Sequence, residues 1–370
     1  MWTPTDSALA LLPARDAHDS DSGDPNADGV APQLAFRAVD EPQPGQNWLR
    51  AFTSMWPAYR TWWLKEGEWA RPDRSTCQAM LDTWMPELRP TFDRLVDLVG
   101  NDPLAARFLS MYRPPGFVVG CSQAAFAGDG GPVLVRNYDY PASRAEGIVY
   151  RTSWTGRAVI GMSDCLWGLL DGVNDAGLAA SLTFGGRPSV GDGFGIPLVI
   201  RYVLEVCEDV ETACAVLSGV PVHAVQNVTL LDRGGDFATV RLGPDREPEV
   251  LTVPVATNHQ HRGDWPEYER AVATFERERR LLELLRTRGM SGDRLVRAFL
   301  VEPLYRAAFA SGLGTLYTAV YFPAEGRAEY RWPDHMTTQT FERFAEQHHT
   351  QHYAGTSAQK LQLPDAKETL

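Results

Sequence analysis

The chain has 370 residues, 44% of them hydrophobic, so it is long enough to bury a large core as one sizeable domain or two closely packed ones. Its formal net charge is −12, and its Lys and Arg residues form no dense run. Such a charge repels phosphate backbones and anionic lipids, which argues against nucleic acid and membrane surfaces as partners.

The sequence shows no sign of a membrane span or of export. No stretch reaches the roughly 18 uninterrupted apolar residues of a membrane helix. The apolar run at residues 8–12 is too short for a signal peptide and lacks a basic flank, so a cytoplasmic protein is expected. The five cysteines are odd in number and include no CxxC pair, which indicates reduced thiols rather than disulfides or a zinc site. No metal or other cofactor is implied.

The first third of the chain divides into two parts. Residues 1–33 are rich in Asp, Ser, Pro, Gly and Ala and are too polar to offset the entropy of ordering, which predicts a disordered acidic tail. Apolar residues then recur at helical spacing from Trp48 to about Leu109, which predicts a helical segment over residues 34–120. Its tryptophans at residues 56–84 are typical of a helical core, with an acyl-binding pocket as the alternative.

The helical spacing of apolar residues ends at residues 112–116, where Pro and Gly prevent a helix from continuing. Strands are expected at residues 117–119, 132–138, 158–162, 178–183, 227–232, 238–242, 249–256, 315–322 and 328–332, with a turn at 171–174. Helices are expected at residues 196–207, 210–217 and 266–288. Without a regular βαβ alternation, this order predicts an α+β catalytic core over residues 121–347, followed by a polar C-terminal tail at 348–370.

Five short motifs follow one another in the chain, and their order points to a function. They are Gly120-Cys121, Arg136-Asn137-Tyr138-Asp139, the segment from Asp171 to Leu178, the segment from Gln226 to Asp232, and Ala256-Thr257-Asn258-His259. Arg136 and Asp139 follow Cys121 by 15 and 18 positions, a spacing that suits one β-hairpin.

This set resembles the N-terminal nucleophile (Ntn) hydrolases, in the branch that contains choloylglycine hydrolase, penicillin V acylase and the isopenicillin-N acyltransferase-like proteins. The resemblance covers roughly residues 117–335. It implies a four-layer αββα sandwich and an autoproteolytic precursor that cuts itself between Gly120 and Cys121. The helical segment would then remain bound as a separate chain.

Elementary chemistry supports a nucleophilic role for Cys121. A thiol is a poor nucleophile while protonated, and a neighbouring α-amino group with a pKa of about 7.7–8.0 can accept its proton. That amine does not exist while the Gly120–Cys121 bond is intact, so cleavage would be the activating step. Glycine at position 120 lets the thiol approach the carbonyl without a Cβ clash. The alternative is an inert buried cysteine, the interpretation we favour for the other four.

The resemblance also implies roles for residues around Cys121. Asp139 would hold the α-amino group, Arg136 would favour the thiolate, and Asn258 would donate to the oxyanion. The alternatives are an ordinary Arg/Asp pair at a strand end and a turn residue. Thr183 stands where the bile-salt enzymes often carry Asn, which leaves the second oxyanion donor open.

Three further features remain ambiguous in the sequence. Asn227 could orient the substrate or Asn258, or it could simply cap a strand. A late arginine expected near the cysteine matches Arg277 best, with Arg279 as a second register and a solvated helix face as the alternative. The glycine-rich residues 185–195 are expected to border the substrate pocket.

The predicted function is a cysteine amidohydrolase or acyltransferase working through a Cys121 thioester. Its partners would be a small acyl substrate, such as an acyl-CoA or an N-acyl amine, and its own cleaved N-terminal chain; a homo-oligomer is also compatible. One rival is a Cys121–His259 hydrolase without self-cleavage, and another is a catalytically silent binding protein on the same scaffold. A metal hydrolase lacks a ligand motif.

Overall fold

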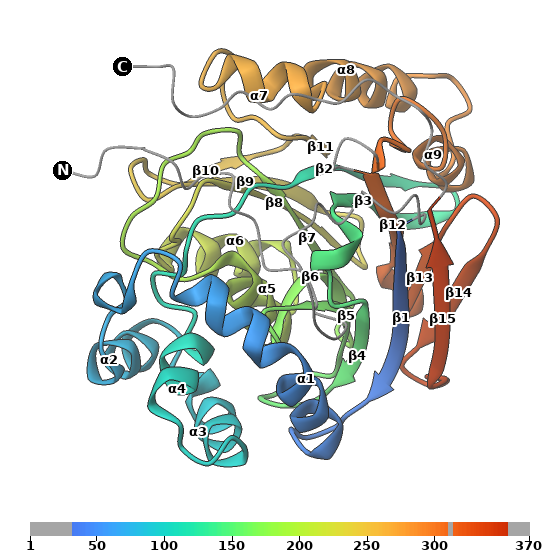
Figure 1. Ribbon diagram of the computed structural model, residues 1–370. Helices are drawn as coiled ribbons and strands as arrows, with labels where there is room; N and C mark the ends of the chain where they lie inside the picture. The colour runs from blue at the N-terminus through green and yellow to red at the C-terminus, as the bar shows by residue number, and fades with distance from the viewer. Residues whose placement is uncertain (1–31, 310–313, 354–370) are drawn as a thin grey trace.

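A computed structural model describes residues 32–309 and 314–353 (Figure 1). Residues 1–31 of the predicted acidic tail and residues 354–370 of the predicted C-terminal tail lie outside the described residues. No helix in the described part of the chain is long and apolar enough to span a membrane.

Two β-sheets form the centre of the molecule. The larger sheet has the strand order β10-β9-β8-β7-β6-β5-β4-β1-β15, and the smaller has the order β11-β2-β3-β12-β13-β14. The strands of the larger sheet are β1 (Gln33–Asp40), β4 (Ile148–Thr152), β5 (Val159–Asp164), β6 (Gly168–Asn174), β7 (Leu178–Phe184), β8 (Gln226–Asp232), β9 (Phe237–Leu242), β10 (Glu249–Leu251) and β15 (Gln347–His352). Those of the smaller sheet are β2 (Gly120–Gly128), β3 (Gly131–Tyr140), β11 (Val255–Ala256), β12 (Gly314–Phe322), β13 (Arg327–Arg331) and β14 (Met336–Thr340).

Helices cover the outer faces of both sheets, which completes four layers (Figure 1). Two helices, α5 (Ile196–Val206) and α6 (Val210–Gly219), pack on the larger sheet against β6 and β9. On the smaller sheet, α8 (Thr274–Leu285) and α9 (Gly292–Phe299) pack against β2, β11 and β3, and the short α7 (Pro266–Ala271) precedes α8. The inner faces of the sheets meet where β2 contacts β7 and β8. This is the predicted αββα sandwich.

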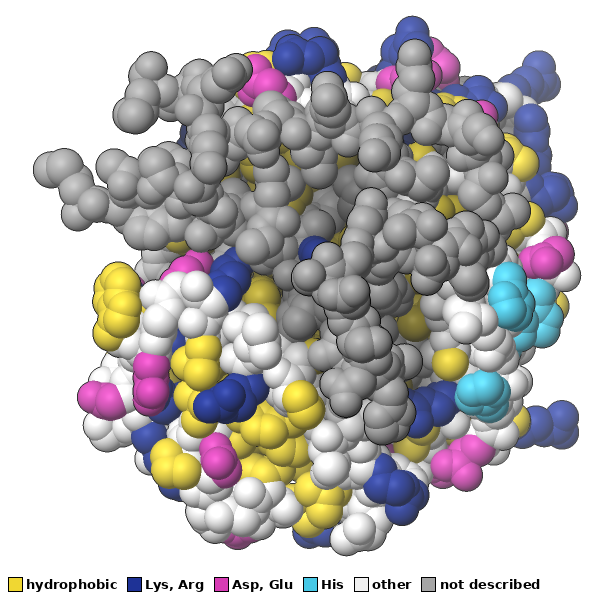
Figure 2. All heavy atoms as spheres, viewed as in Figure 1, with side chains coloured by type: hydrophobic (Ala, Val, Ile, Leu, Met, Phe, Trp, Pro, Cys, Tyr) yellow, Lys and Arg dark blue, Asp and Glu magenta, His cyan; other side chains and the backbone are white. Residues whose placement is uncertain are grey.

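The N-terminal segment forms a separate group of helices beside the sandwich, at the lower left of Figure 1. They are α1 (Gln46–Trp63), α2 (Arg74–Trp84), α3 (Arg89–Leu98) and α4 (Pro103–Leu109). The ring of Phe108 packs against Trp56, Tyr59 and Trp63, so most of the predicted tryptophan cluster is core. Hydrophobic side chains also reach the surface over these helices (Figure 2).

The structure corrects several expectations about the ends of elements. The segment expected to be helical from residue 34 begins with strand β1, and residues 348–352, expected in a polar tail, belong to strand β15. These two strands pair antiparallel, and β1 also pairs parallel with β4. Backbone hydrogen bonds therefore stabilise strands that the pattern of side chains did not predict. The helix expected at 266–288 is broken at Ala273, whose φ of 49° is left-handed.

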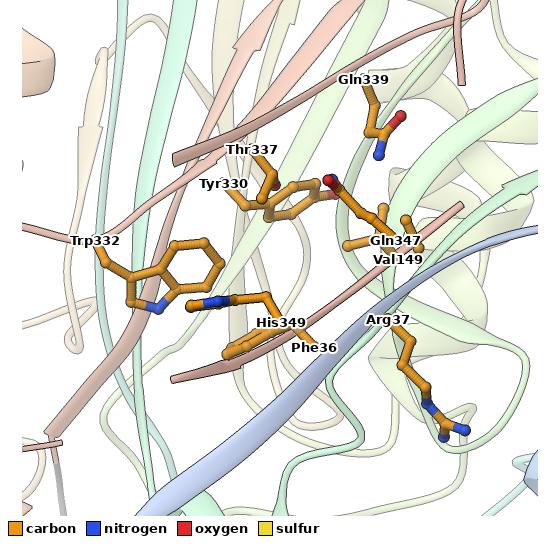
Figure 3. Close-up of a pocket in the computed structure, with 10 residues that line it drawn as sticks. Phe36, Arg37, Val149, Tyr330, Trp332, Thr337, Gln339, Gln347 and His349 are labelled. Carbon is orange, nitrogen blue, oxygen red and sulfur yellow. The ribbon is translucent and has the colours of Figure 1, made fainter. Parts of the chain in front are cut away.

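The junction between β1, β15 and the end of the smaller sheet contains a small pocket (Figure 3). Its volume is about 20 Å³, enough for about one water molecule. Phe36 and Trp332 lie against each other there, with ring centroids 4.8 Å apart. This pocket is too small for a substrate, and it marks where the N-terminal strand packs onto the core.

Candidate active site

The hairpin of β2 and β3 positions the candidate nucleophile. Cys121 is the second residue of β2, its side chain is fully buried, and in the register of the hairpin it lies opposite Tyr138. The same register puts Gly120 opposite Asp139 and Gln123 opposite Arg136. The hairpin therefore brings the first two sequence motifs together, as the 15-residue spacing predicted.

Arg136 provides a positive charge beside the thiol. Its Nη2 donates to Cys121 Sγ at 3.4 Å, while its Nη1 pairs with Asp171 and donates to Tyr317 Oη at 3.2 Å. Burial raises the pKa of the Cys121 thiol, and the charge of Arg136 opposes that rise. Asp171 and Tyr317 fix the guanidinium in one orientation, so Arg136 is held at the sulfur.

Asn258 and Arg277 hold the backbone of Cys121. Asn258 Oδ1 accepts from Cys121 N at 2.8 Å, and Asn258 Nδ2 donates to the carbonyl oxygens of Val119 and Phe184 at 3.3 and 3.2 Å. Arg277 donates from Nη1 to Cys121 O at 2.8 Å and from Nη2 to Asn258 Oδ1 at 2.7 Å. Three amide groups around the Gly120–Cys121 bond are therefore fixed by side chains.

The sequence left two candidates for the late arginine, Arg277 and Arg279, and the structure separates them by their burial. Arg277 lies on the face of α8 that packs against β2, and it is fully buried at Cys121. Arg279 lies on the exposed face of the same helix. The solvated-face interpretation therefore applies to Arg279 and not to Arg277.

Asp139 lies beside Gly120, and Asn258 occupies the position that the resemblance gave to Asp139. The Asp139 carboxylate accepts from Thr315 Oγ1 at 2.7 Å and pairs with Arg277 at 3.2 Å, whereas the acceptor at Cys121 N is Asn258. A Cβ at Gly120 would sit 3.1 Å from Asp139 Cβ and 3.3 Å from its Oδ2. The close approach of the carboxylate to the backbone therefore favours glycine at position 120, because a Cβ there would push the Asp139 side chain by a few tenths of an ångström.

Asn227 and Thr183 support the segment that carries Asn258. Asn227 Nδ2 donates to Thr183 Oγ1 at 3.1 Å and to the carbonyl oxygens of Thr257 and His259, at 3.0 and 3.2 Å. Thr183 Oγ1 donates to Thr257 O at 2.9 Å. Both side chains thus hold residues 257–259 in place, which matches the interpretation of Asn227 as a residue that orients Asn258.

His259 is engaged away from the thiol. Its Nδ1 lies 2.9 Å from Thr274 Oγ1, its Nε2 lies 3.3 Å from Glu278, and its ring packs on Phe275 with centroids 4.4 Å apart. None of the contacts described for His259 reaches Cys121. The structure therefore gives no support to a Cys121–His259 pair.

Sequence reasoning missed the residues that hold the charged groups. Asp171 was expected in a turn, but it lies inside β6, where it binds Arg136 and accepts from the hydroxyls of Tyr317 and Tyr321. Thr315 was likewise not singled out. An Asp inside the apolar run Leu169-Leu170-Asp171-Gly172-Val173 was the available signal, because a carboxylate buried in a strand needs a partner.

A pocket of about 310 Å³ is lined in part by the residues that precede β2. Its walls come from the α1–α2 connection, from residues 113–118 just before the nucleophile, and from the glycine-rich segment at residues 187–192. Phe184 belongs to its lining and is also the residue whose carbonyl oxygen accepts from Asn258. The glycine-rich segment thus borders a pocket, and Cys121 itself is not among the residues that line it.

Comparison with protein families finds one family model that matches most of the core. The model describes acyl-coenzyme A:6-aminopenicillanic acid acyl-transferase and matches residues 126–336, a span that begins five residues after Cys121. No curated protein sequence gives a significant match.

Comparison with solved structures finds distant similarity to three hydrolases. Penicillin V acylase from Agrobacterium tumefaciens is 16% identical, with a TM-score of 0.45 over 60% of this chain and 87% of its own. A conjugated bile acid hydrolase variant from Clostridium perfringens is 13% identical, with a TM-score of 0.41 over 64% of this chain and 98% of its own. The Caenorhabditis elegans orthologue of N-acylethanolamine-hydrolyzing acid amidase is 16% identical, with a TM-score of 0.40 over 55% of this chain and 93% of its own.

Proposed function

The chain belongs to the acyl-coenzyme A:6-aminopenicillanic acid acyl-transferase family of Ntn hydrolases, and from this premise we propose that Cys121 is its nucleophile. The proposed enzyme first cuts its own Gly120–Cys121 bond. It then transfers the acyl group of a small amide or thioester, such as an N-acyl amine or an acyl-CoA, through a Cys121 thioester.

The single observation that carries this proposal is the arrangement around one buried sulfur. Arg136 Nη2 lies 3.4 Å from Cys121 Sγ, and Asn258 Oδ1 lies 2.8 Å from Cys121 N. A structural cysteine needs neither a buried guanidinium at its sulfur nor a buried amide at its nitrogen. Arg136 is paired with Asp171, and a buried ion pair adds little net stability to a fold, so the placement of its free Nη2 at the sulfur is better explained by chemistry than by stability.

The cleavage step moves one acyl group and then adds one water. The thiolate attacks the carbonyl carbon of Gly120, the C–N bond breaks, and the nitrogen of Cys121 takes a proton to become a primary amine. Gly120 is then held on Sγ as a thioester. Water hydrolyses this thioester, which leaves a carboxylate on Gly120 and a free thiol on Cys121.

The new α-amino group would be placed to act as the base. It occupies the position of Cys121 N, where Asn258 Oδ1 accepts from it. The guanidinium of Arg277 binds the same Asn258 oxygen, and a nearby positive charge lowers the pKa of an amine, so more of the amine is neutral near pH 7. The thiol and its proton acceptor then belong to one residue.

Asn258 would also serve the oxyanion after cleavage. In the uncleaved chain, its Nδ2 donates to the carbonyl oxygen of Val119. After cleavage, Val119 lies next to the new C-terminus at Gly120. Movement of this new C-terminus frees one N–H of Asn258 next to the thiol. This N–H can then donate to the oxyanion of the tetrahedral intermediate that forms when the thiolate attacks a bound substrate. Thr183 donates to Thr257 O instead, so its role here is to position residues 257–259.

Trapping the acyl-enzyme tests this function. The purified protein is mixed with a para-nitrophenyl ester, quenched in acid and analysed by peptide mass spectrometry. We expect the mass of the acyl group on the peptide that begins with Cys121, and an added amine should shorten the lifetime of this adduct if the enzyme transfers the acyl group rather than hydrolysing it.

Cys214→Ala is the matched control, because Cys214 is the partly exposed thiol among the free cysteines and would capture a reactive ester non-specifically. Labelling that disappears in Cys214→Ala and persists in Cys121→Ala would reject the proposal.

A further inference from the structure

The carbonyl oxygen of Val119, the residue before Gly120, accepts hydrogen bonds from two side chains. Tyr268 Oη donates to it at 2.5 Å, and Asn258 Nδ2 donates to it at 3.3 Å. Val119 lies between the end of α4 and the start of β2, outside the helices and strands, and it is fully buried. Two fixed donors directed at one oxygen beside a nucleophile are the arrangement that stabilises an oxyanion.

Tyr268 is a candidate for the second oxyanion donor, which the sequence left open at Thr183. Thr183 does not take this role, because its hydroxyl donates to Thr257 O at 2.9 Å. Asn258 Nδ2 and Tyr268 Oη both reach the same atom, Val119 O. An oxygen that replaces Val119 O at Asn258 therefore also lies within reach of the Tyr268 hydroxyl.

Packing fixes the Tyr268 ring and keeps its hydroxyl protonated. The ring meets Phe184 edge to face, with centroids 5.3 Å apart, and stacks on Trp265 at 5.1 Å. Phe184 also holds the other donor, because its carbonyl oxygen accepts from Asn258. Burial raises the pKa of the Tyr268 phenol well above its ordinary value, and the neighbouring Cys121 raises it further. The hydroxyl therefore remains a donor at neutral pH.

The break between α7 and α8 lets two residues of one helical pattern reach the site (Figure 1). Tyr268 on α7 and Arg277 on α8 are nine positions apart. In a straight helix with 3.6 residues per turn, such side chains point in directions about 180° apart. The left-handed Ala273 separates the two helices. Tyr268 then binds Val119 O, and Arg277 binds Cys121 O at 2.8 Å.

We propose that Tyr268 is a catalytic residue of the mature enzyme, whose hydroxyl donates together with Asn258 Nδ2 to the oxyanion of the bound acyl group. Val119 O occupies this pair of donors until self-cleavage. The inference rests on the proposed function, because it requires attack by Cys121 on an acyl substrate. Tyr268 comes from α7 and not from the strand position of Thr183, so this donor is a feature of this chain.

The proposed role is confined to one stage of acyl transfer. The thiolate bonds to the acyl carbon, and an electron pair of the carbonyl bond moves to its oxygen. The pair returns as the bond to the leaving group breaks and the thioester forms. Tyr268 binds the oxygen while it is negative. In the uncut chain its hydroxyl binds Val119 O and not the scissile carbonyl of Gly120, so self-cleavage depends on it only for positioning.

The two reactions are compared in Tyr268→Phe, which removes the hydroxyl and keeps the ring. Intact mass over time gives the rate of self-cleavage, and para-nitrophenolate release from para-nitrophenyl acetate by the cleaved protein gives acyl transfer. We expect self-cleavage to slow less than about tenfold, the effect of one neutral hydrogen bond. We expect kcat for the ester to fall about 100- to 1,000-fold with KM nearly unchanged, the effect of one oxyanion donor.

Tyr353→Phe is the matched control. Tyr353 is also buried and donates to a backbone carbonyl oxygen, that of Leu316, at 2.7 Å, and this oxygen also accepts from Trp332 Nε1. This variant should lower the melting temperature and leave kcat unchanged. An unchanged kcat in Tyr268→Phe, an equal fall of kcat in both variants, or a Tyr268→Phe chain that no longer cuts itself overturns the inference.

Failure of the proposed function has a different signature. A wild-type protein that releases para-nitrophenolate no faster than Cys121→Ala rejects the nucleophile, and the inference about Tyr268 with it. The outcomes in Tyr268→Phe reject only the role of its hydroxyl, since wild-type activity is present in that comparison.

Discussion

The thiol of Cys121 is subject to two opposing influences within one buried site. Burial favours the neutral thiol and raises its pKa, while Arg136 favours the thiolate. Arg136 can remain charged there because Asp171 neutralises it, and Asp171 is in turn bound by the hydroxyls of Tyr317 and Tyr321. The network thus keeps a cation at the sulfur of a fully buried site.

Replacing Arg136 tests this charge effect. Arg136→Gln removes a cation next to the thiol, which should raise the pKa of the thiol and slow self-cleavage about 10- to 1,000-fold at neutral pH. Because the thiolate forms above the pKa, the cleavage rate of the variant should recover as the pH is raised. The measurement is the fraction of intact chain over time, across a range of pH.

Arg201→Gln is the matched control, because Arg201 is also fully buried and paired with an acid, Glu205, but it lies on α5. We expect this variant to lower the melting temperature without shifting the pH profile of cleavage. An unshifted profile in Arg136→Gln would show that Arg136 does not act on the thiol.

Strand β1 connects the N-terminal segment to the core. It lies between β15 and β4 and pairs with both, and Phe36 packs on Trp332 of the smaller sheet (Figure 3). Trp48 Nε1 also donates to Leu166 O, and Trp167 Nε1 donates to Leu109 O. Cleavage at Gly120 would leave all of these contacts intact.

We therefore predict that the two fragments stay together after cleavage. They should co-elute in native size-exclusion chromatography and separate only in denaturant. Ala38→Pro should weaken their association, because Ala38 pairs with Gln347 on one side and Val149 on the other, and proline removes a donor from the ladder.

Arg37→Ala tests the same strand without changing its backbone, since the Arg37 side chain points away from the ring cluster of Figure 3. This variant should elute like wild type. Fragments that separate in native buffer in the wild-type protein would contradict the role given to β1.

The elements differ in how far the sequence could predict them. Strand β3 was predictable from its apolar run and from the hairpin spacing, whereas the strand expected at residues 117–119 was wrong: this segment is irregular, and β2 begins only at Gly120. Strand β15 was not predictable, because its residues Gln347–His352 are polar and its order comes from backbone pairing with β1 across more than 300 positions. The break at Ala273 within the helical pattern was also hidden, because alanine is a good helix former.

At the scale of the whole molecule, the site is assembled from both sheets and from α8. Cys121, Arg136 and Asn258 were predictable from the order of motifs, and the structure brings them together. Asp171 and Tyr317 were not, because Asp171 reaches Arg136 only through the stacking of the two sheets, and Tyr317 only through the pairing of β12 with β3.

The central claim is that the chain cuts itself before Cys121, and the intact mass of the purified protein tests it most directly. We predict two species for the wild-type protein, of roughly one-third and two-thirds of the 41.0 kDa chain, the larger with Cys121 as its first residue. Cys121→Ala should give one uncut chain. A wild-type protein that is fully active as a single unbroken chain would contradict the account.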